Sequence, residues 1–582
     1  RIYTANELEI YKVFKGQLPS MSCQIITQGG IVGKDKHEVH PSLQLGIGDV
    51  GVFFLQESTA NLTEINGFKL SSIAEHQGFY RYDDISGRAI SPFDCNQSVN
   101  QLHTAIQAQT NQVFTQNIPY IFEPLQFPES GGLVPVITNI SPDTLNAGVG
   151  DTLTITGTGF ETFNSTTSKV QLLDAGINSS AVYVDVSNFI SWTDLEIKLI
   201  VPHKSDNGST VGGGDFIKVV NQSGTATSSQ VLTINYNHIN ANFLEEIQHI
   251  DNNSSGGYTF VFNNAFETTV AGSENAFKRA LETWRCATRI NWETSISPTT
   301  TNTYGNDGVN LVSYGATGTN SNSVYGGFFS KCHLFYSNVS CTGTDWYLTE
   351  ADIIFSSTYS SFFHTATTLP AGQIDFETEA LHSLGYAHLL SNVRDVNDPM
   401  QAVLPNPFGD TLRSLIQNNI DGGIYIRNKS VNNTVCSQPL MNISPPCISC
   451  GFSLSTSSDT ICAGDTAFVT ATIIGGGMGG ATNTFEFRMY DISTNIAVDS
   501  IIPSDSTATF GVTLAGTYVI VGNNPVSGCN EQDTFSLVVD SPTTSSTTIT
   551  ACNSYIWNGL TYTTSGVYDS TFTNAAGCDS VA

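Results

Sequence analysis

Short apolar runs of strand length, separated by turn residues, recur through most of this chain and favour a β-rich fold. Residues 24–27 and 51–55 are two early examples, and glycines lie beside both runs. Runs of this kind between glycine-containing turns are typical of strands in a sheet. The chain has 582 residues, whereas one hydrophobic core stops growing at roughly 250–300 residues. We therefore expect about three to five domains, most of them built from strands.

The balance of charge excludes several classes of partner. Lysine and arginine together number 22, against 51 aspartates and glutamates, which gives a formal net charge of -29 at pH 7. A surface of this sign repels phosphate backbones and anionic lipid headgroups. Nucleic acid is therefore not an expected partner. No run of the sequence approaches the roughly 20 apolar residues that span a bilayer, so we expect no membrane span in this chain.

The segment from 134 to 237 carries the clearest pattern of a β domain. An Ile-Ser-Pro triplet at 140–142 precedes the run 150–160, in which alternating residues lead into a Gly-Thr-Gly-Phe corner. Residues 198–202 form a later strand-like run. The segment resembles the IPT/TIG immunoglobulin-like modules, and this resemblance implies a β-sandwich over residues 134–237.

Three other regions are also predicted to be β structure. The first is an N-terminal β domain at 1–125. The second has strand-like runs at 467–472 and 516–521, and residues 452–540 resemble an immunoglobulin- or PKD-like domain. The third is bracketed by Cys552 and Cys578, and residues 549–582 resemble the start of a Cys-bracketed surface repeat. A Ser-Pro-Pro triplet at 444–446 precedes the second of these regions. Because proline cannot join the hydrogen-bonded ladder of a sheet, the triplet indicates a linker.

Residues 240–435 differ from the rest because helical periodicity occurs there, at 274–287 and 376–391. In the first of these runs Phe277 and Trp284 recur seven residues apart, on one face of a helix. Strand-like residues surround both runs. The predicted fold class is therefore a multidomain, mainly β protein of immunoglobulin-like sandwiches, with one α/β domain that contains two long helices.

The second helical run carries the candidate site. From residue 382 to 392 it reads His-Ser-Leu-Gly-Tyr-Ala-His-Leu-Leu-Ser-Asn, which follows the spacing of the zinc-protease helix H-E-x-x-H-x-x-G-x-x-H. The four key positions, which are the first ligand, the glutamate base, the second ligand and the third ligand, fall on His382, Ser383, Tyr386 and Asn392.

The surroundings of this helix extend the match. The segment resembles the metzincin-like (matrixin-related) domains of secreted, multidomain Bacteroidetes surface proteins, which commonly read D-F-E-[ST]-x-A-L-H-E-L-G-H and continue to a methionine. Here residues 375–378 read Asp-Phe-Glu-Thr, and 398–400 read Asp-Pro-Met. The resemblance implies a metzincin-like domain at 240–435, with Met400 as the Met-turn residue beneath the metal position.

Most of the chemistry of a zinc protease is missing from this frame. Catalytic zinc needs three protein ligands and a bound water, which a glutamate activates. Only His382 is retained, and the Ser383 hydroxyl cannot act as a base at neutral pH. Rescue would require Glu379, Asp395 or Asp398 to converge on the same point. We therefore expect a catalytically inactive pseudoprotease that needs no cofactor.

His388 does not restore the missing ligand. It is rotated by about 240° from His382 around an α-helix, so the two imidazoles face different directions. We expect His388 to pack against another part of the fold.

Two functional hypotheses follow. The first is a cell-surface adhesive or structural protein that carries the inactive domain and binds a protein or glycan surface ligand, or other copies of itself. The second is an active secreted zinc metalloendopeptidase with an atypical metal site, for which zinc would be the cofactor. The missing base and ligands favour the first hypothesis.

Twelve cysteines indicate an oxidising compartment. The candidate pairs within predicted modules are Cys23 with Cys95, Cys332 with Cys341, Cys462 with Cys529, and Cys552 with Cys578. The C-x-x-C spacing at 447–450 would need a second such pair to form a zinc site, so a disulfide role is expected there. Together with the resemblance above, the cysteines predict an extracellular or cell-surface location.

Overall fold

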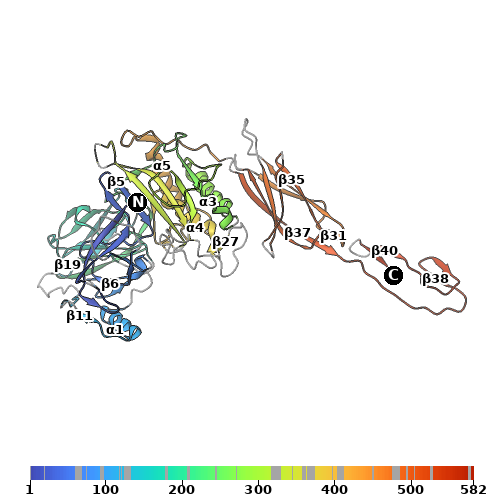
Figure 1. Cartoon of the computed structure of the whole chain (residues 1–582), viewed down its shortest axis with the longest axis horizontal. Coiled ribbons are helices and arrows are strands. Elements are labelled where there is room, and N and C mark those ends of the chain that lie inside the picture. Colours follow the sequence, from blue (N-terminus) through green and yellow to red (C-terminus); the bar gives the residue numbers. More distant parts are fainter. Residues whose placement is uncertain are drawn as a thin grey trace. The chain divides into compact units, whose positions relative to one another are not determined.

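A computed structural model describes residues 2–581 of the chain (Figure 1). The residues within that range that it leaves undescribed are 19, 59–68, 74, 85, 92–96, 117, 119–120, 124–132, 177–180, 206–209, 243–244, 271, 316–328, 342, 344, 357–361, 364–373, 396, 403–411, 448–450, 475–484, 493–495, 504, 525–528 and 574–577. The protein is mainly β, with 45% strand and 14% helix, which confirms the predicted β-rich class. It divides into two compact units, the first ending at Pro445 and the second running from Pro446 to Ala582.

The predicted IPT/TIG segment folds as two packed sheets. One has the order β12 (Val136–Ser141), β14 (Thr152–Thr158), β18 (Glu196–Ile200) and β17 (Phe189–Trp192). The other has the order β13 (Thr144–Ala147), β20 (Gly224–His238), β19 (Asp215–Asn221), β15 (Lys169–Leu173) and β16 (Ala181–Tyr183). Leu153 and Ile155 alternate inward along β14 and are fully buried. The end of β14 requires glycine, because a Cβ on Gly157 would lie 2.5 Å from the Phe160 ring.

The helices surround a second, eight-stranded sheet in the same unit. Its order is β23 (Trp292–Thr294), β22 (Tyr258–Phe262), β24 (Asn310–Tyr314), β26 (Trp346–Phe355), β25 (Ser330–Ser337), β5 (Asp35–His40) and β4 (Gly30–Val32), and β21 (Ile247–Gln248) also pairs with β26. The strands from β23 to β26 run parallel, whereas β25 runs antiparallel to both of its neighbours. Every residue of β24 and β25 is buried, as expected for strands that are covered on both faces.

The helices of this region agree only in part with the prediction. They are α2 (Phe266–Thr269), α3 (Ser273–Thr288), α4 (Phe376–Ala387) and α5 (Gln417–Asn432). α3 confirms the first predicted helix and buries Phe277 and Trp284. α4 is shorter than predicted, because the backbone of Leu389 is left-handed (φ 65°) and the next two residues form strand β29 (Leu390–Ser391), which pairs with the end of β20.

The N-terminal region contains a helix that the β prediction missed. Its strands are β1 (Tyr3–Glu9), β2 (Lys12–Val13), β3 (Ser22–Gln28), β6 (Gly51–Phe53), β7 (Leu55–Glu57), β8 (Lys69–Ser72), β9 (Phe79–Tyr82), β10 (Ala89–Ile90) and β11 (Thr115–Gln116). α1 (Val99–Thr110) lies between the last two and begins with a capping box formed by Ser98 and Gln101. The sequence signature of this cap, Ser-x-x-Gln, was present and marks a helix start.

The second unit contains a two-sheet domain followed by two hairpins. The sheets have the orders β30 (Gly451–Thr456), β32 (Ala467–Ile474), β35 (Thr507–Val512), and β31 (Thr460–Cys462), β37 (Cys529–Asp540), β36 (Gly516–Asn524), β33 (Glu486–Asp491), β34 (Ile496–Ile501). The hairpins are β38 (Tyr555–Trp557) with β39 (Leu560–Tyr562), and β40 (Thr571–Thr573) with β41 (Asp579–Val581). A separate hydrophobic core fills the two-sheet domain. The predicted domain boundaries along the chain remain predictions.

Candidate functional site

Helix α4 is buried along its whole length, and polar contacts hold its first turn. All twelve of its residues are buried. The Asp375 side chain accepts a hydrogen bond from the backbone N–H of Thr378 at 2.9 Å, which satisfies a free donor at the helix start. The Arg413 Nε donates to the same carboxylate at 2.9 Å. On another side, Trp284 Nε1 of α3 donates to the Leu381 carbonyl at 2.9 Å. The helix that carries His382 therefore has a fixed position.

The structure brings the three predicted ligand positions together. The rings of His382 and Tyr386 lie 4.8 Å apart, nearly perpendicular to each other. The Tyr386 hydroxyl donates a hydrogen bond to Asn392 Oδ1 at 2.7 Å. The three side chains therefore lie near one another. The second and third positions, however, are joined directly by a hydrogen bond.

The protonation of His382 and Tyr386 follows from their partners and burial. His382 Nδ1 lies 2.6 Å from the Pro399 carbonyl, and since a carbonyl only accepts, Nδ1 carries the proton and Nε2 has a lone pair. Burial lowers the pKa of His382 to about 4, so the ring is neutral at pH 7. Burial also raises the pKa of Tyr386 above its usual value. Tyr386 is therefore a neutral phenol at pH 7 and a poor metal ligand.

The side chain at the predicted base position points toward β25. Ser330 donates a hydrogen bond to the Glu379 carboxylate, and Ser383 Oγ lies 2.6 Å from Ser330 Oγ. Because the Ser330 proton is already used, Ser383 is the donor in the second bond. Burial raises the pKa of Glu379 to about 7. The Glu379 carboxyl thus binds the serine pair.

Met400 lies in contact with the helix that carries the site. It is buried, and a Cβ on Gly385 would clash with its sulfur and lie 3.2 Å from the Trp284 ring. The backbone N–H of Met400 donates to Asp398 at 2.6 Å, and Asn419 donates to the same oxygen at 2.8 Å. This position suits the predicted role as a floor, and the Met-turn assignment itself remains a prediction.

The residues present do not fit a catalytic zinc site. Such a site needs three protein ligands. Within the described part of the chain, no set of three His, Cys, Asp or Glu side chains that includes His382 brings its donor atoms within 4.8 Å of one another. Asp395 is exposed, and Asp398 accepts the hydrogen bonds of Met400 and Asn419.

His388 packs away from the His382 site, in the direction that its rotation on the helix predicts. Its ring lies 5.2 Å from each of the rings of Trp284 and Trp292. The Thr288 hydroxyl donates to the Trp284 carbonyl, so His388 Nε2 donates to Thr288 Oγ1 at 3.0 Å. Burial lowers the pKa of His388 to about 3. This histidine is a neutral residue of the packed interior.

Strand β5 also contributes to this site, which was not predicted from the sequence. The His40 ring stacks on the Tyr386 ring, with centroids 4.8 Å apart. Beside it, Glu38 is buried and accepts from Lys204 at 2.6 Å and pairs with Lys36 at 2.9 Å. The alternation Lys-x-Glu-x-His from 36 to 40 was the available signal, because it places three polar side chains on one face of a strand.

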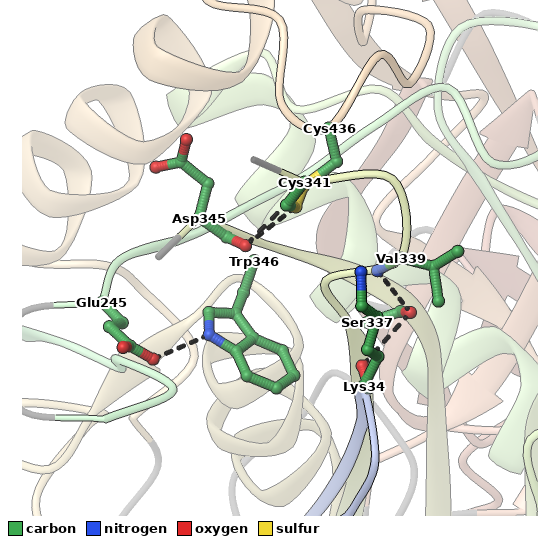
Figure 2. Close-up of a disulfide and its surroundings, with 8 residues drawn as sticks. All are labelled: Lys34, Glu245, Ser337, Val339, Cys341, Asp345, Trp346 and Cys436. Carbon is green, nitrogen blue, oxygen red and sulfur yellow. Dashed lines mark hydrogen bonds between the residues drawn. A yellow bond between two sulfur atoms is a disulfide. The ribbon is translucent and has the colours of Figure 1, made fainter. Parts of the chain in front are cut away.

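Most of the predicted disulfide pairs are wrong. Cys341 bonds to Cys436, as Figure 2 shows, and Cys462 bonds to Cys578. Cys332 and Cys552, the predicted partners of Cys341 and Cys578, are free cysteines. Cys529, the predicted partner of Cys462, is not bonded to it.

Two other cysteine predictions have separate outcomes. Cys23 is free and buried, and its predicted partner Cys95 lies outside the described residues. Cys447 of the C-x-x-C segment is disulfide-bonded, as is Cys286, whereas Cys450 is among the residues left undescribed. The spacing rule failed because folding, rather than proximity in the sequence, decides which sulfurs meet.

Comparisons with known proteins support one module. Residues 135–236 match the IPT/TIG domain family, which confirms the predicted module at 134–237. A search of curated proteins found no match. Among the described helices, none has the length and apolar character needed to cross a membrane.

Similarity to solved structures is weak. Dpr1 IG1 bound to DIP-eta IG1 is 14% identical over 15% of this chain and 96% of that chain, with a TM-score of 0.11. A CARDB domain from Pyrococcus furiosus in complex with di-metal ions is 17% identical over 16% of this chain and 88% of that chain, with a TM-score of 0.12. Escherichia coli alpha-2-macroglobulin is 10% identical over 70% of this chain and 26% of that chain, with a TM-score of 0.13. TM-scores this low carry no argument, and the family match identifies the module at residues 135–236.

Proposed function

We propose that this chain is an extracellular or cell-surface adhesive or structural protein, in which a metzincin-like domain has lost catalysis and acts as a binding or architectural module. The IPT/TIG match and the mainly β structure support a multidomain surface protein. The disulfides support an oxidising location, because such bonds persist outside the cytosol. Its ligand is a protein or glycan surface, or another copy of the chain.

The observation that carries the proposal is the hydrogen bond between Tyr386 and Asn392 at 2.7 Å. These residues take the second and third ligand positions in the metzincin pattern. A metal bound there would require both side chains to offer lone pairs to it, whereas here the phenol proton is directed at the amide oxygen. The polar groups of the two positions satisfy each other without a metal.

The proposed loss of catalysis also follows from the base position. The Ser383 hydroxyl is bound to Ser330, and a hydroxyl does not accept a proton from water at neutral pH. Loss of a general base typically costs about 10² to 10⁴ in rate. Together with two missing imidazole ligands, this change removes both metal binding and water activation.

Metal analysis and a protease assay on the purified full-length chain test the proposal. We expect less than a tenth of an equivalent of zinc after dialysis, and no cleavage of an unfolded protein substrate with or without added zinc. The alternative is the active metalloendopeptidase. Stoichiometric zinc, together with chelator-sensitive proteolysis that disappears in His382→Ala, would establish that alternative and overturn the proposal.

A further inference from the structure

Strand β5 completes a sheet that belongs to a distant part of the chain. It pairs antiparallel with β25 over six residues, from His40 opposite Cys332 to Asp35 opposite Ser337. In Figure 1 it lies, in blue, beside the yellow-green strands of that sheet. Without β5, β25 would be the edge strand, and an edge with unpaired N–H and C=O groups is a general binding place for an extended peptide.

The large hydrophobic cluster beneath β25 takes its buried members from other parts of the chain than the N-terminal region. The large core cluster runs from Ile140 to Met441 and, among the described residues, takes no member from positions before 140. The small apolar clusters of the N-terminal region are separate from it. β5 therefore adds no buried residue to this cluster and meets it through polar side chains, while its own apolar residue, Val39, is also buried.

On the face of β5 toward α4, contacts between charged side chains hold the strand in place. Lys36 donates to the Ala241 carbonyl, and Glu38 lies between Lys36 at 2.9 Å and Lys204 at 2.6 Å. Only 3% of Glu38 is exposed. Although burial alone would raise it, the two lysines hold the pKa of Glu38 well below its usual value. Removal of the Glu38 charge would leave the buried Lys36 without this partner, which is costly.

Aromatic contacts hold β5 on both of its faces. His40 stacks on Tyr386 of α4. On the opposite face, His37 stacks on Phe335 of β25, with centroids 4.3 Å apart and planes 6° from parallel. At the hairpin turn, the Ser337 hydroxyl donates to the Lys34 carbonyl, as Figure 2 shows. Backbone pairing and alternate side-chain pockets together form the usual recognition mode for an added strand.

We propose that the edge of β25 is a strand-binding site for the sequence from Asp35 to His40, filled in this structure by the chain's own strand and able to accept the same strand from a second copy. Every copy carries both the strand and the edge, so the contacts between copies are identical to those within one copy. The inference goes beyond the proposed function, because strand binding at β25 does not depend on whether the helix binds zinc.

Charge exchange between two full-length variants tests this proposal. In Glu38→Lys, and separately in Lys204→Glu, the residues at positions 38 and 204 repel within one chain and release the strand. When the two variants are mixed, opposite charges face each other between chains. We expect a 1:1 mixture to form dimers at a concentration where each variant alone keeps the mass of the wild-type chain. The double variant Glu38→Lys with Lys204→Glu in one chain is the matched control and should keep that mass as well.

Two results of the mixing experiment would overturn the proposal. One is the absence of dimers while both variants show the near-UV circular dichroism of the wild-type chain. The other is equal dimer formation by the double variant and the mixture. Hydrogen exchange on the unaltered chain covers the case in which a single variant does not fold. Strand release predicts that β5 amides exchange at least tenfold faster than those between β24 and β26, and equal protection would also refute it. Neither readout involves zinc or proteolysis, so failure here leaves the proposed function to its own tests.

Discussion

At the scale of single residues, His382 keeps the arrangement of a ligating histidine while its neighbours do not. Its Nδ1 donates to the Pro399 carbonyl, and a hydrogen bond from the second ring nitrogen to a backbone carbonyl is how metal-binding histidines are commonly oriented. Tyr386 and Asn392, which the metzincin resemblance predicts at the second and third ligand positions, are hydrogen-bonded to each other. The local geometry thus supports restoration of a metal site by exchange of side chains.

The triple variant Ser383→Glu, Tyr386→His, Asn392→His should bind zinc with a stoichiometry near one. His382 and two introduced imidazoles would supply the three ligands, and the glutamate would supply a base. Isothermal titration with zinc is the measurement. The matched control is Ser383→Glu alone, which retains a single imidazole and should show no saturable binding. Equal binding by the control and the triple variant would mean that the metal is held elsewhere.

The buried His388 should make stability depend on pH. Its folded pKa of about 3 lies below the unfolded value, so the unfolded chain binds an extra proton as pH falls below about 6.5. The free energy of unfolding therefore falls with pH in that range. In His388→Gln, the loss of stability between pH 7 and pH 5 should be smaller than in wild type by roughly 2 kcal/mol. Urea unfolding at the two pH values measures this difference, and parallel losses in the two proteins would contradict it.

At the scale of elements, α5 shows tertiary packing overriding a local signal. Two adjacent glycines lie in its interior, where glycine is unfavourable by about 1 kcal/mol relative to alanine. A Cβ on Gly422 would lie 2.8 Å from the Tyr236 ring, and one on Gly423 would lie 2.6 Å from the Thr288 methyl. The glycines therefore allow the helix to approach β20 and α3 closely, and their sequence signal favours a loop instead.

Gly422→Ala should destabilise the protein although alanine favours helix. The gain in helix propensity is about 1 kcal/mol, whereas forcing a methyl into a packed interior typically costs about 1–3 kcal/mol. We expect a net loss, measured as a lower midpoint of chemical unfolding. Asn428→Ala, at an exposed position of the same helix, is the control and should be neutral or slightly stabilising. A gain for Gly422→Ala would show that the helix packs less closely than the structure indicates.

At the scale of the whole molecule, strand pairings and a disulfide between residues far apart in the sequence hold each unit together. β5 joins the N-terminal region to the sheet around β25. β29 joins the end of α4 to β20 of the IPT/TIG segment. In the second unit, the disulfide between Cys462 and Cys578 closes a loop of 116 residues. Each link connects residues that are far apart in the sequence, so none follows from a short motif.

The Cys462–Cys578 disulfide should protect the C-terminal hairpins. Ile556 and Leu560 of the first hairpin and Val567 in the connection to the second are exposed. A crosslink over a loop this long is worth roughly 4–5 kcal/mol. The double variant Cys462→Ser with Cys578→Ser should be cleaved at least tenfold faster after Pro542 by a broad-specificity protease, as judged by mass spectrometry. Cys552→Ser, which removes a free thiol, is the control. Equal cleavage rates in all three proteins would show that the bond does not hold this segment.

The sequence by itself determined the features that depend on neighbours along the chain. The period of Phe277 and Trp284 predicted α3, and the alternating run before the Gly-Thr-Gly-Phe corner predicted strand β14, because helix faces and strand faces are encoded by residues a few positions apart. Only the tertiary structure decided the pairing of β5, the helix at α5, the disulfide partners and the bond between Tyr386 and Asn392. These depend on which distant surfaces meet, and burial and close packing then override local preference.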